Sequence, residues 1–259
     1  MLARITPVVL TRNEEANIGR CLKKLTWAGD VVVVDSFSSD NTVKVARDYE
    51  NVRIFQRRFD SHENQWNFAL TKTDIDTEWV MALDADYILT DELVEEIRLT
   101  APNDGLGGYW VDFAYATFGK KLRGGIYPPN VVLFKKDEGR YIQDGHTQRL
   151  VIDSPLELLT SKIIHDDRKP LSHWFKSQLR YQRIESEKLS NSPAKDLSFA
   201  DRLRKLVIPA PFLIFLYVLF VRRAILDGWA GWFYAFQRFV AELMLSLLVL
   251  ERLISSRSD

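Results

Sequence analysis

Two aspartates, Asp84 and Asp86, carry the clearest chemistry in the chain, and they directly follow the apolar run 78–83 (EWVMAL). A run of this length predicts a short buried strand. Open α/β sheets bind ligands beyond the carboxyl ends of their strands, so both carboxylates are expected in such a crevice. Carboxylate oxygens suit Mg²⁺ or Mn²⁺, which proteins commonly share with substrate phosphates. Taken alone, Asp-x-Asp is equally compatible with a solvated turn.

Three further polar clusters stand at or near the ends of other expected strands. They are residues 11–15 (TRNEE), 35–40 (DSFSSD) and 65–67 (QWN). In a parallel sheet the carboxyl ends share one edge, so these clusters should converge on the same crevice. The expected ligand is a nucleoside diphosphate, with Asp35 accepting hydrogen bonds from the ribose or base. The chain has neither the G-x-G-x-x-G fingerprint after its first strand nor a P-loop.

The first hundred residues alternate between strand and helix patterns, which predicts a parallel, doubly wound sheet. Four consecutive valines, Val31 to Val34, indicate a strand that is apolar on both faces and lies inside such a sheet. The other expected strands cover 5–10, 52–55 and 79–83. The expected helices begin near Ile18 and cover 42–49, 64–70 and 91–99.

Beyond residue 100 the pattern changes to glycine-punctuated, aromatic-rich segments with short strands expected at 131–134 and 149–152. We expect this part to shape an acceptor site. Residues 171–205 are polar and helical, with eight Lys or Arg against four Asp or Glu. Such a segment is either a solvated helix face or a contact with anionic lipid headgroups.

The tail from Leu206 is strongly apolar. Residues 206–221 carry no charge, and Pro209 and Pro211 interrupt their start. Residues 229–247 place aromatic and aliphatic side chains at three- and four-residue spacing, which predicts an amphipathic helix. We favour docking on a membrane surface over packing on the catalytic domain or a partner subunit. A spanning hairpin is disfavoured because Asp227, Arg238 and Glu242 would be costly at mid-membrane depth.

Composition sets outer limits on function. The chain has 259 residues, 46% of them hydrophobic, which supports a real core. Lys and Arg number 35 and Asp and Glu number 35, so overall charge gives no case for nucleic-acid binding. The single cysteine, Cys21, excludes a disulfide framework and is expected on a buried helix face. We expect no cleavable signal peptide at the start.

Three motifs in order resemble the signature of family-2 glycosyltransferases with the GT-A fold. They are residues 8–15 (VVLTRNEE), 32–42 (VVVDSFSSDNT) and 83–86 (LDAD). The resemblance covers about residues 5–100 and extends more loosely through the 124–128 loop and His146 to the tail. The layout is similar to enzymes that add sugars to lipopolysaccharide core or lipid-linked glycans. It implies a nucleotide-sugar donor such as a UDP-hexose, a divalent metal, and inversion at the anomeric carbon.

The same resemblance implies roles for individual residues. Asp86 would be the main metal ligand, with Asp84 and His165 completing the site. Donor-binding residues would be Thr11, Asn13, Glu14, Asp35, Ser38, Asp40, Gln65, Asn67, Asp84 and Ala85. Acceptor-binding residues would be Gly124, Gly125, Tyr127 and Pro128.

The chain departs from the family pattern at two places. Tyr87 stands where relatives often have glutamate after Asp-Ala-Asp, and His146-Thr147 stands where many have His-Glu. A displacement needs a base near the acceptor hydroxyl, and we expect Asp144 in that role, with His146 as second choice. Asp144 is otherwise a turn aspartate. The cluster 165–167 (HDD) either completes the metal or diphosphate site or caps a helix beginning near Pro170.

The expected organisation is a GT-A domain over 1–205 and membrane-associating helices over 206–259. Within the domain, 1–100 would bind the nucleotide-sugar, 101–170 would form the acceptor half, and 171–205 would be the basic helical region. The expected location is the cytoplasmic face of the inner membrane, as a peripheral or monotopic protein. Two alternatives stay open: a sugar nucleotidyltransferase, which normally has a glycine-rich loop absent from 11–15, and a non-catalytic membrane scaffold.

Overall fold

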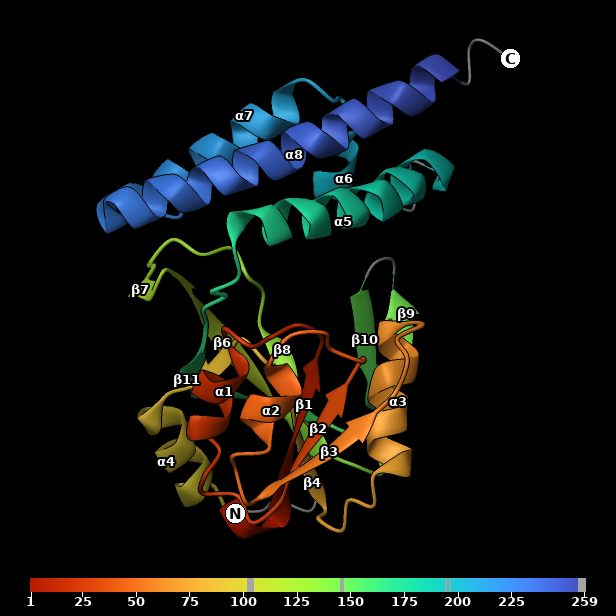
Figure 1. The fold of residues 1–259 in the computed structure, drawn as a ribbon. Coiled ribbons are helices and arrows are strands. Elements are labelled where there is room, and N and C mark those ends of the chain that lie inside the picture. Colours follow the sequence, from red (N-terminus) through yellow and green to blue (C-terminus); the bar gives the residue numbers. More distant parts are fainter. Residues whose placement is uncertain (102–104, 145–146, 194, 196, 256–259) are drawn as a thin grey trace. The chain divides into compact units, whose positions relative to one another are not determined.

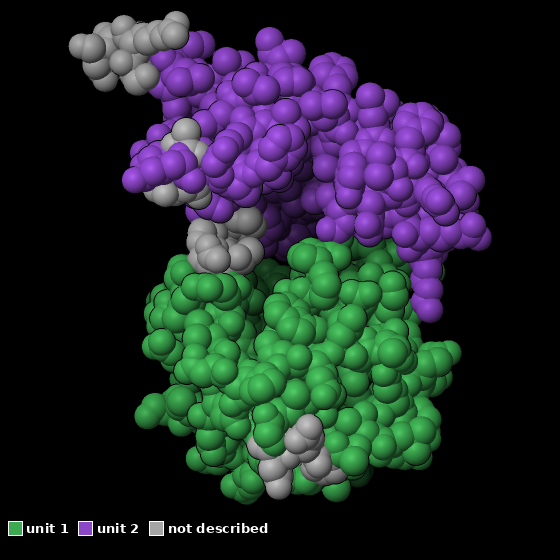
Figure 2. All heavy atoms as spheres, turned by 180° about the vertical axis from the view of Figure 1, so that it is seen from behind, with its two compact units in different colours: residues 1–119, 127–169 green, residues 120–126, 170–259 purple. Residues whose placement is uncertain are grey.

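The computed structural model describes residues 1–101, 105–144, 147–193, 195 and 197–255. The chain forms two compact units (Figure 2). Unit 1 contains residues 1–119 and 127–169, and unit 2 contains residues 120–126 and 170–259. This division falls after Lys169 and not at the expected 205/206 boundary, because the helix that follows Pro170 packs along the C-terminal helix. The functional assignment of each range remains a prediction.

The central sheet of unit 1 confirms the doubly wound architecture. Its order is β3-β2-β1-β4-β8-β6-β11-β5, and the first four strands run parallel (Figure 1). Thr11 pairs with Asp35 and Leu10 with Asp84, so the expected polar strand ends do share one edge. The sheet strands are β1 (Ile5–Thr11), β2 (Val31–Asp35), β3 (Val52–Gln56), β4 (Trp79–Asp84), β5 (Tyr87–Leu89), β6 (Gly108–Thr117), β8 (Asn130–Lys135) and β11 (Leu156–His165). A separate antiparallel hairpin joins β9 (Arg140–Asp144) and β10 (Thr147–Val151).

The sheet is apolar on both faces, as the valine run predicts. Val31 and Val33 pack in one core cluster, whereas Val32 and Val34 pack in the other. The first cluster also contains side chains of α1 (Ile18–Lys23), α2 (Thr42–Ala46) and α4 (Asp91–Leu99). The second contains side chains of α3 (His62–Lys72). Helices therefore cover both faces and leave the polar strand ends at the rim.

Two helices of unit 1, α3 and α4, begin at residues whose side chains cap them. The Ser61 hydroxyl accepts a hydrogen bond from the Asn64 N–H before α3, and the Thr90 hydroxyl accepts one from the Leu93 N–H before α4. Helix α2 ends at Ala46, three residues earlier than expected. The chain continues to Tyr49 in tighter turns, and the Tyr49 hydroxyl donates to the carbonyl oxygen of Gly19 in α1. A short 3₁₀ turn, η1 (Leu2–Arg4), precedes β1.

Unit 2 is helical apart from β7 (Lys120–Lys121). Its helices are α5 (Leu171–Asn191), α6 (Phe199–Arg204), α7 (Pro209–Leu216) and α8 (Trp229–Ser255), with the short turns η3 (Tyr217–Val221) and η4 (Ala224–Asp227) between the last two. Pro209 opens α7 as its first residue, where a missing N–H costs nothing. Helix α8 packs against α7 and α5, and residues of unit 2 form a separate small apolar core.

Two charged side chains of α8, Glu242 and Arg252, have ion-pair partners within unit 2. The Arg204 guanidinium contacts the Glu242 carboxylate at 2.7 Å and lies near Asp201 and Glu185. Arg252 pairs with Glu187 of α5. Among the described residues, α8 alone is long and apolar enough to cross a membrane by length and composition, and a third of its most apolar window is buried (33%).

Candidate functional site

The carboxyl ends of β1 and β2 place Asp35 at the centre of a hydrogen-bonded cluster. Its side chain is fully buried. It accepts hydrogen bonds from the Thr11 hydroxyl (3.1 Å), the Ser38 N–H (3.0 Å) and hydroxyl, and the Gln56 amide (3.1 Å). These bonds fix the carboxylate at the sheet edge, as expected for the end of a buried parallel strand.

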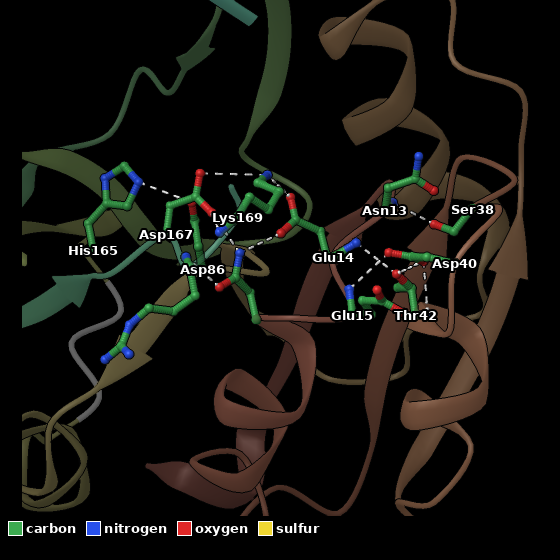
Figure 3. A network of polar contacts seen from close by, with 12 residues as sticks. Asn13, Glu14, Glu15, Ser38, Asp40, Thr42, Asp86, His165, Asp167 and Lys169 are labelled. Atoms are coloured by element: carbon green, nitrogen blue, oxygen red, sulfur yellow. Dashed lines mark hydrogen bonds and ion pairs between the residues drawn. The ribbon is translucent and has the colours of Figure 1, made fainter. Parts of the chain in front are cut away.

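The loops after β1 and β2 hold each other in place (Figure 3). The Asn13 N–H donates to the Ser38 hydroxyl, and the Glu15 N–H donates to the Asp40 carboxylate. Asp40 also accepts from the N–H and hydroxyl of Thr42 at the start of α2. These bonds outweigh burial and lower the pKa of Asp40. Asn13 and Phe37 both have a positive φ of 56°, a conformation that is rare for such residues.

The end of β4 brings Asp84, Asp86 and His165 together. Asp84 and Asp86 are two residues apart, with Ala85 between them buried in the core. His165 ends β11, and its Nε2 lies 3.1 Å from Asp86 Oδ2. Strand pairing of His165 with Tyr87 sets this contact. All three residues predicted to bind a metal therefore lie at one end of the sheet, supplied by β4, the turn after it and β11.

The carboxylates and the imidazole perturb one another strongly. Burial and repulsion from Asp86 raise the pKa of Asp84 to about 6. Burial works against the ionised form of Asp86, but the adjacent His165 outweighs it and lowers the pKa of Asp86. Burial likewise works against the charged imidazole, yet Asp86 raises the pKa of His165. Without a cation, the Asp86–His165 pair is thus favoured as an ion pair, and a metal bound by His165 would displace the imidazole proton.

The donor atoms around Asp86 fit a hard divalent cation. Asp86 Oδ1 is buried and has no hydrogen-bond partner, and the same holds for His165 Nδ1. An orphaned buried carboxylate oxygen is costly unless a cation or donor satisfies it. Among the residues the structure describes, no group of three or more His, Cys, Asp and Glu side chains is preassembled as a metal cage. Two protein ligands suffice where substrate phosphates supply the others.

Next to Asp86 lies a network that sequence reasoning missed, centred on Lys169. Its ammonium contacts Glu14 at 2.5 Å and Asp167 at 3.8 Å, and Asn17 donates to both of these carboxylates (Figure 3). Burial raises the pKa of Glu14 to about 7, against the attraction of Lys169. Lys169 is 155 positions from Glu14 in the sequence, so no local motif could have found this pair.

The structure excludes one of the two interpretations of residues 165–167, and the metal or diphosphate role stays a prediction. Asp166 is paired with Arg20 and Arg168, both at 2.8 Å, and Asp167 accepts from Asn17 and the Lys169 N–H. The N-cap of α5 is Pro170, which has no side-chain capping bond. The capping interpretation is therefore wrong, because both carboxylates are engaged within unit 1.

Aromatic side chains enclose His165. Tyr87, Tyr115 and Tyr127 have ring centroids within 4.7–5.3 Å of the imidazole, and the Tyr87 and Tyr127 hydroxyls lie 2.7 Å apart. Tyr87, which replaces the glutamate of related sequences, opens β5 and is 5% exposed. Its role in this structure is to pack against the imidazole and Phe113.

Gln65 and Asn67 face different surroundings. Gln65 is fully buried, donates to the Ser36 hydroxyl and accepts from Arg57, so it lies next to the Asp35 cluster. Asn67 instead exchanges two hydrogen bonds with the Tyr141 backbone and lines a surface cavity of about 430 Å³ with α3 and β9 residues. The amide nitrogen and the amide oxygen of the Asn67 side chain therefore both link α3 to β9. Arg57, whose N–H donates to the Asp35 carbonyl, is a second residue that the motifs missed.

The predicted acceptor residues fall in both units. Gly124 and Gly125 belong to unit 2, and the Gly125 carbonyl accepts from Arg222 at 2.6 Å. Tyr127 belongs to unit 1 and contacts His165, whereas Pro128 is exposed. Asp144 is the last residue of β9, and its side chain lies outside the described part of the chain. His146 also lies outside the described residues.

The fold and the strand-end carboxylates define a GT-A-like α/β transferase. The chain belongs to glycosyl transferase family 2, whose family model matches residues 7–146. This membership favours a glycosyltransferase over the nucleotidyltransferase alternative. The predicted family and fold class are confirmed.

Known proteins similar to this chain are also glycosyltransferases. A lipopolysaccharide core biosynthesis glycosyltransferase, LpsC of Rhizobium meliloti, is 26% identical over 149 residues, covering 53% of this chain and 53% of that protein. An uncharacterized glycosyltransferase of Rickettsia typhi, RT0209, is 33% identical over 98 residues, covering 38% of this chain and 32% of that protein. The chain thus spans between about a third and about half of the length of these relatives.

Among solved structures, a mannosyltransferase from Pyrobaculum calidifontis, PcManGT, in complex with GDP-Man and Mn²⁺, has the same fold. The TM-score is 0.55 at 14% identity, with 95% of this chain and 87% of that chain covered. The likeness supports the GT-A assignment.

Proposed function

We propose that this protein transfers a hexose from a UDP-linked donor to a lipid-linked or lipopolysaccharide-type glycan, with inversion and with Mg²⁺ or Mn²⁺. The proposal rests on one observation above all. Asp86, with an unsatisfied carboxylate oxygen and His165 at 3.1 Å, stands at the same sheet edge as the buried Asp35 cluster. A nucleoside diphosphate bound along this edge would reach from the Asp35 cluster to Asp86.

Each group then has a part in the reaction. Asp35, Thr11 and the Ser38 loop would position the nucleoside, and Asp86 with His165 would hold the metal. When bound, a divalent cation supplies Lewis-acid stabilisation of the charge on the leaving diphosphate, worth several kcal/mol. The tyrosines around His165 exclude water from that side of the site. Asp144, at the end of β9, is our candidate base for the acceptor hydroxyl, with His146 second.

Replacement of the proposed metal ligand tests this function. Asp86→Asn should lower Mn²⁺-dependent release of UDP from a UDP-sugar by at least about 100-fold, since it removes a charged ligand of the metal. The matched control is Asp137→Asn, because the Asp137 side chain is 94% exposed, and it should keep full activity. Circular dichroism should give both variants the spectrum of the unchanged protein. Equal activity of Asp86→Asn and Asp137→Asn would refute the metal assignment.

We further propose that unit 2 holds the enzyme on the cytoplasmic face of the inner membrane. Unit 2 has 16 Lys and Arg against 8 Asp and Glu, a net charge of +8, while unit 1 carries 19 against 27, a net charge of −8. Large apolar side chains are also exposed along α7, the turns after it and α8, among them Phe212, Phe220, Leu226, Trp229, Trp232, Phe236 and Leu247. Basic charge beside exposed aromatic groups suits an anionic lipid surface.

Vesicle flotation tests this membrane contact. The protein should float with phosphatidylglycerol–phosphatidylethanolamine vesicles, and the double change Trp232→Ser with Phe236→Ser should weaken binding at least about tenfold, because each side chain is half exposed on α8. Leu99→Ser is the control, since Leu99 is 75% exposed in unit 1 and should not contact lipid. Unchanged flotation of the double variant would remove α8 from the lipid contact.

A further inference from the structure

Lys169 is a cation enclosed by the acidic side of the site. Its side chain is only 14% exposed, and its ammonium contacts the Glu14 carboxylate, itself 13% exposed, at 2.5 Å. Figure 3 places it between Glu14 and the Asp86 region. Lys169 and Asp86 are close enough for each to shift the pKa of the other in favour of the charged form. The ammonium therefore lies within electrostatic reach of the proposed metal ligand.

The neighbouring arginines are less free to move when the charge near Asp86 changes. Arg20 donates to the Asp166 carboxylate, the Asp166 carbonyl and Asn17, and Arg168 donates to Asp166. Their forked guanidinium groups are held by several bonds at once. Lys169 carries a compact charge on a flexible four-carbon chain, so it can change partner by rotation of its side chain.

The change in charge during the proposed reaction indicates a function for this lysine. A sugar-linked nucleoside diphosphate carries two negative charges, and a divalent metal balances them. When the bond between the anomeric carbon and the β-phosphate oxygen breaks, its electron pair stays on the phosphate. The acceptor oxygen forms the new bond to the sugar carbon and loses its proton to the base. The released diphosphate then carries about three negative charges near neutral pH, one more than the metal balances.

We propose that Lys169 leaves Glu14 for the β-phosphate of the donor and neutralises the charge that develops there, while Glu14 holds the lysine ready beforehand. This assignment rests on the proposed nucleotide-sugar site and names a residue within it. Glu14 is well suited to give the lysine up, because its own carboxylate keeps a hydrogen bond from Asn17 at 2.8 Å after the lysine has moved.

Binding of UDP and of uridine, each with Mn²⁺ and measured by calorimetry, separates this role from a merely structural one. Lys169→Met should weaken UDP at least about tenfold and leave uridine unchanged, since uridine has no phosphate. Lys169→Arg should recover part of the UDP affinity. Lys169→Gln, which removes the charge and keeps a polar side chain, should lose as much UDP affinity as Lys169→Met. Lys162→Met is the matched control on β11, with a side chain 53% exposed, and should change neither affinity.

The outcomes distinguish this assignment from the proposed function. If the unchanged protein binds none of UDP, GDP and ADP with Mn²⁺, the proposed function fails and this assignment fails with it. If it binds UDP and Lys169→Met binds it within twofold, Lys169 has no diphosphate role and the proposed function stands. An equal loss for UDP and uridine also overturns the assignment, because it reports damage to the fold. Should Lys169→Met not fold, Lys169→Gln decides, and a UDP affinity within twofold of the unchanged protein in that variant would overturn the proposal.

Discussion

Asp227 fixes the backbone of the glycine loop within unit 2, and its removal should free that loop. Its buried carboxylate accepts from the N–H groups of Arg123 (2.8 Å) and Gly124 (3.2 Å). Hydrogen bonds to a charged group contribute about 1.5 kcal/mol or more each, so losing both costs about 3 kcal/mol. If local opening becomes easier by that amount, the open population rises by about 100-fold.

Limited proteolysis with trypsin measures this opening directly, because Arg123 itself provides the cleavage site. In Asp227→Ala, cleavage after Arg123 should accelerate by about 100-fold when opening and reclosing are fast relative to cleavage. Asp227→Asn keeps an oxygen acceptor and should show a much smaller change. Cleavage after Arg98 in unit 1, whose side chain is 59% exposed, is the internal reference and should not change. A rise of less than threefold after Arg123 in Asp227→Ala would refute the reasoning, since other bonds would then hold the loop.

Two further predictions follow from burial. A methyl group on Gly231 would lie 1.8 Å from the Ala224 carbonyl oxygen, so Gly231→Ala should destabilise unit 2 by at least about 3 kcal/mol in chemical denaturation. Gly29→Ala meets nothing within 4 Å and should change stability by less than about 1 kcal/mol, and equal effects of the two would contradict the packing described here. Burial raises the pKa of the Cys21 thiol, so Ellman's reagent at pH 8 should modify it only after unfolding. Full modification of the native protein within minutes would show that α1 opens readily.

Periodicity and strand-end motifs predicted unit 1 well because both are local signals. The valine run required a sheet covered on both faces, and the two core clusters divide it residue by residue. Asp84 ends β4 and Asp86 lies in the turn that follows, so the strand-end motif located both carboxylates at one end of the sheet. Helical spacing explains the different surroundings of Gln65 and Asn67. Residues two apart on a helix point in different directions, so one faces Ser36 and the other faces β9.

The partners of the site residues could not be predicted in the same way. Lys169 meets Glu14, and Arg57 meets Gln65, through contacts that carry no spacing signal. The division into two compact units likewise depends on packing, whereas the predicted functional ranges stay a prediction. Polarity separates residues 171–205 from the tail, but α5 packs along α8, and packing decides which elements form a unit.

The opposite charges of the two units have a practical consequence for handling the protein. Its calculated isoelectric point is near neutrality, at about 6.9, a value that describes neither unit. Net charge governs adsorption to charged matrices, so an anion exchanger and a cation exchanger near pH 7 should each retain the chain through a different part of its surface. Elution from either column should depend steeply on salt concentration, and low ionic strength should favour association between oppositely charged units of different molecules during purification.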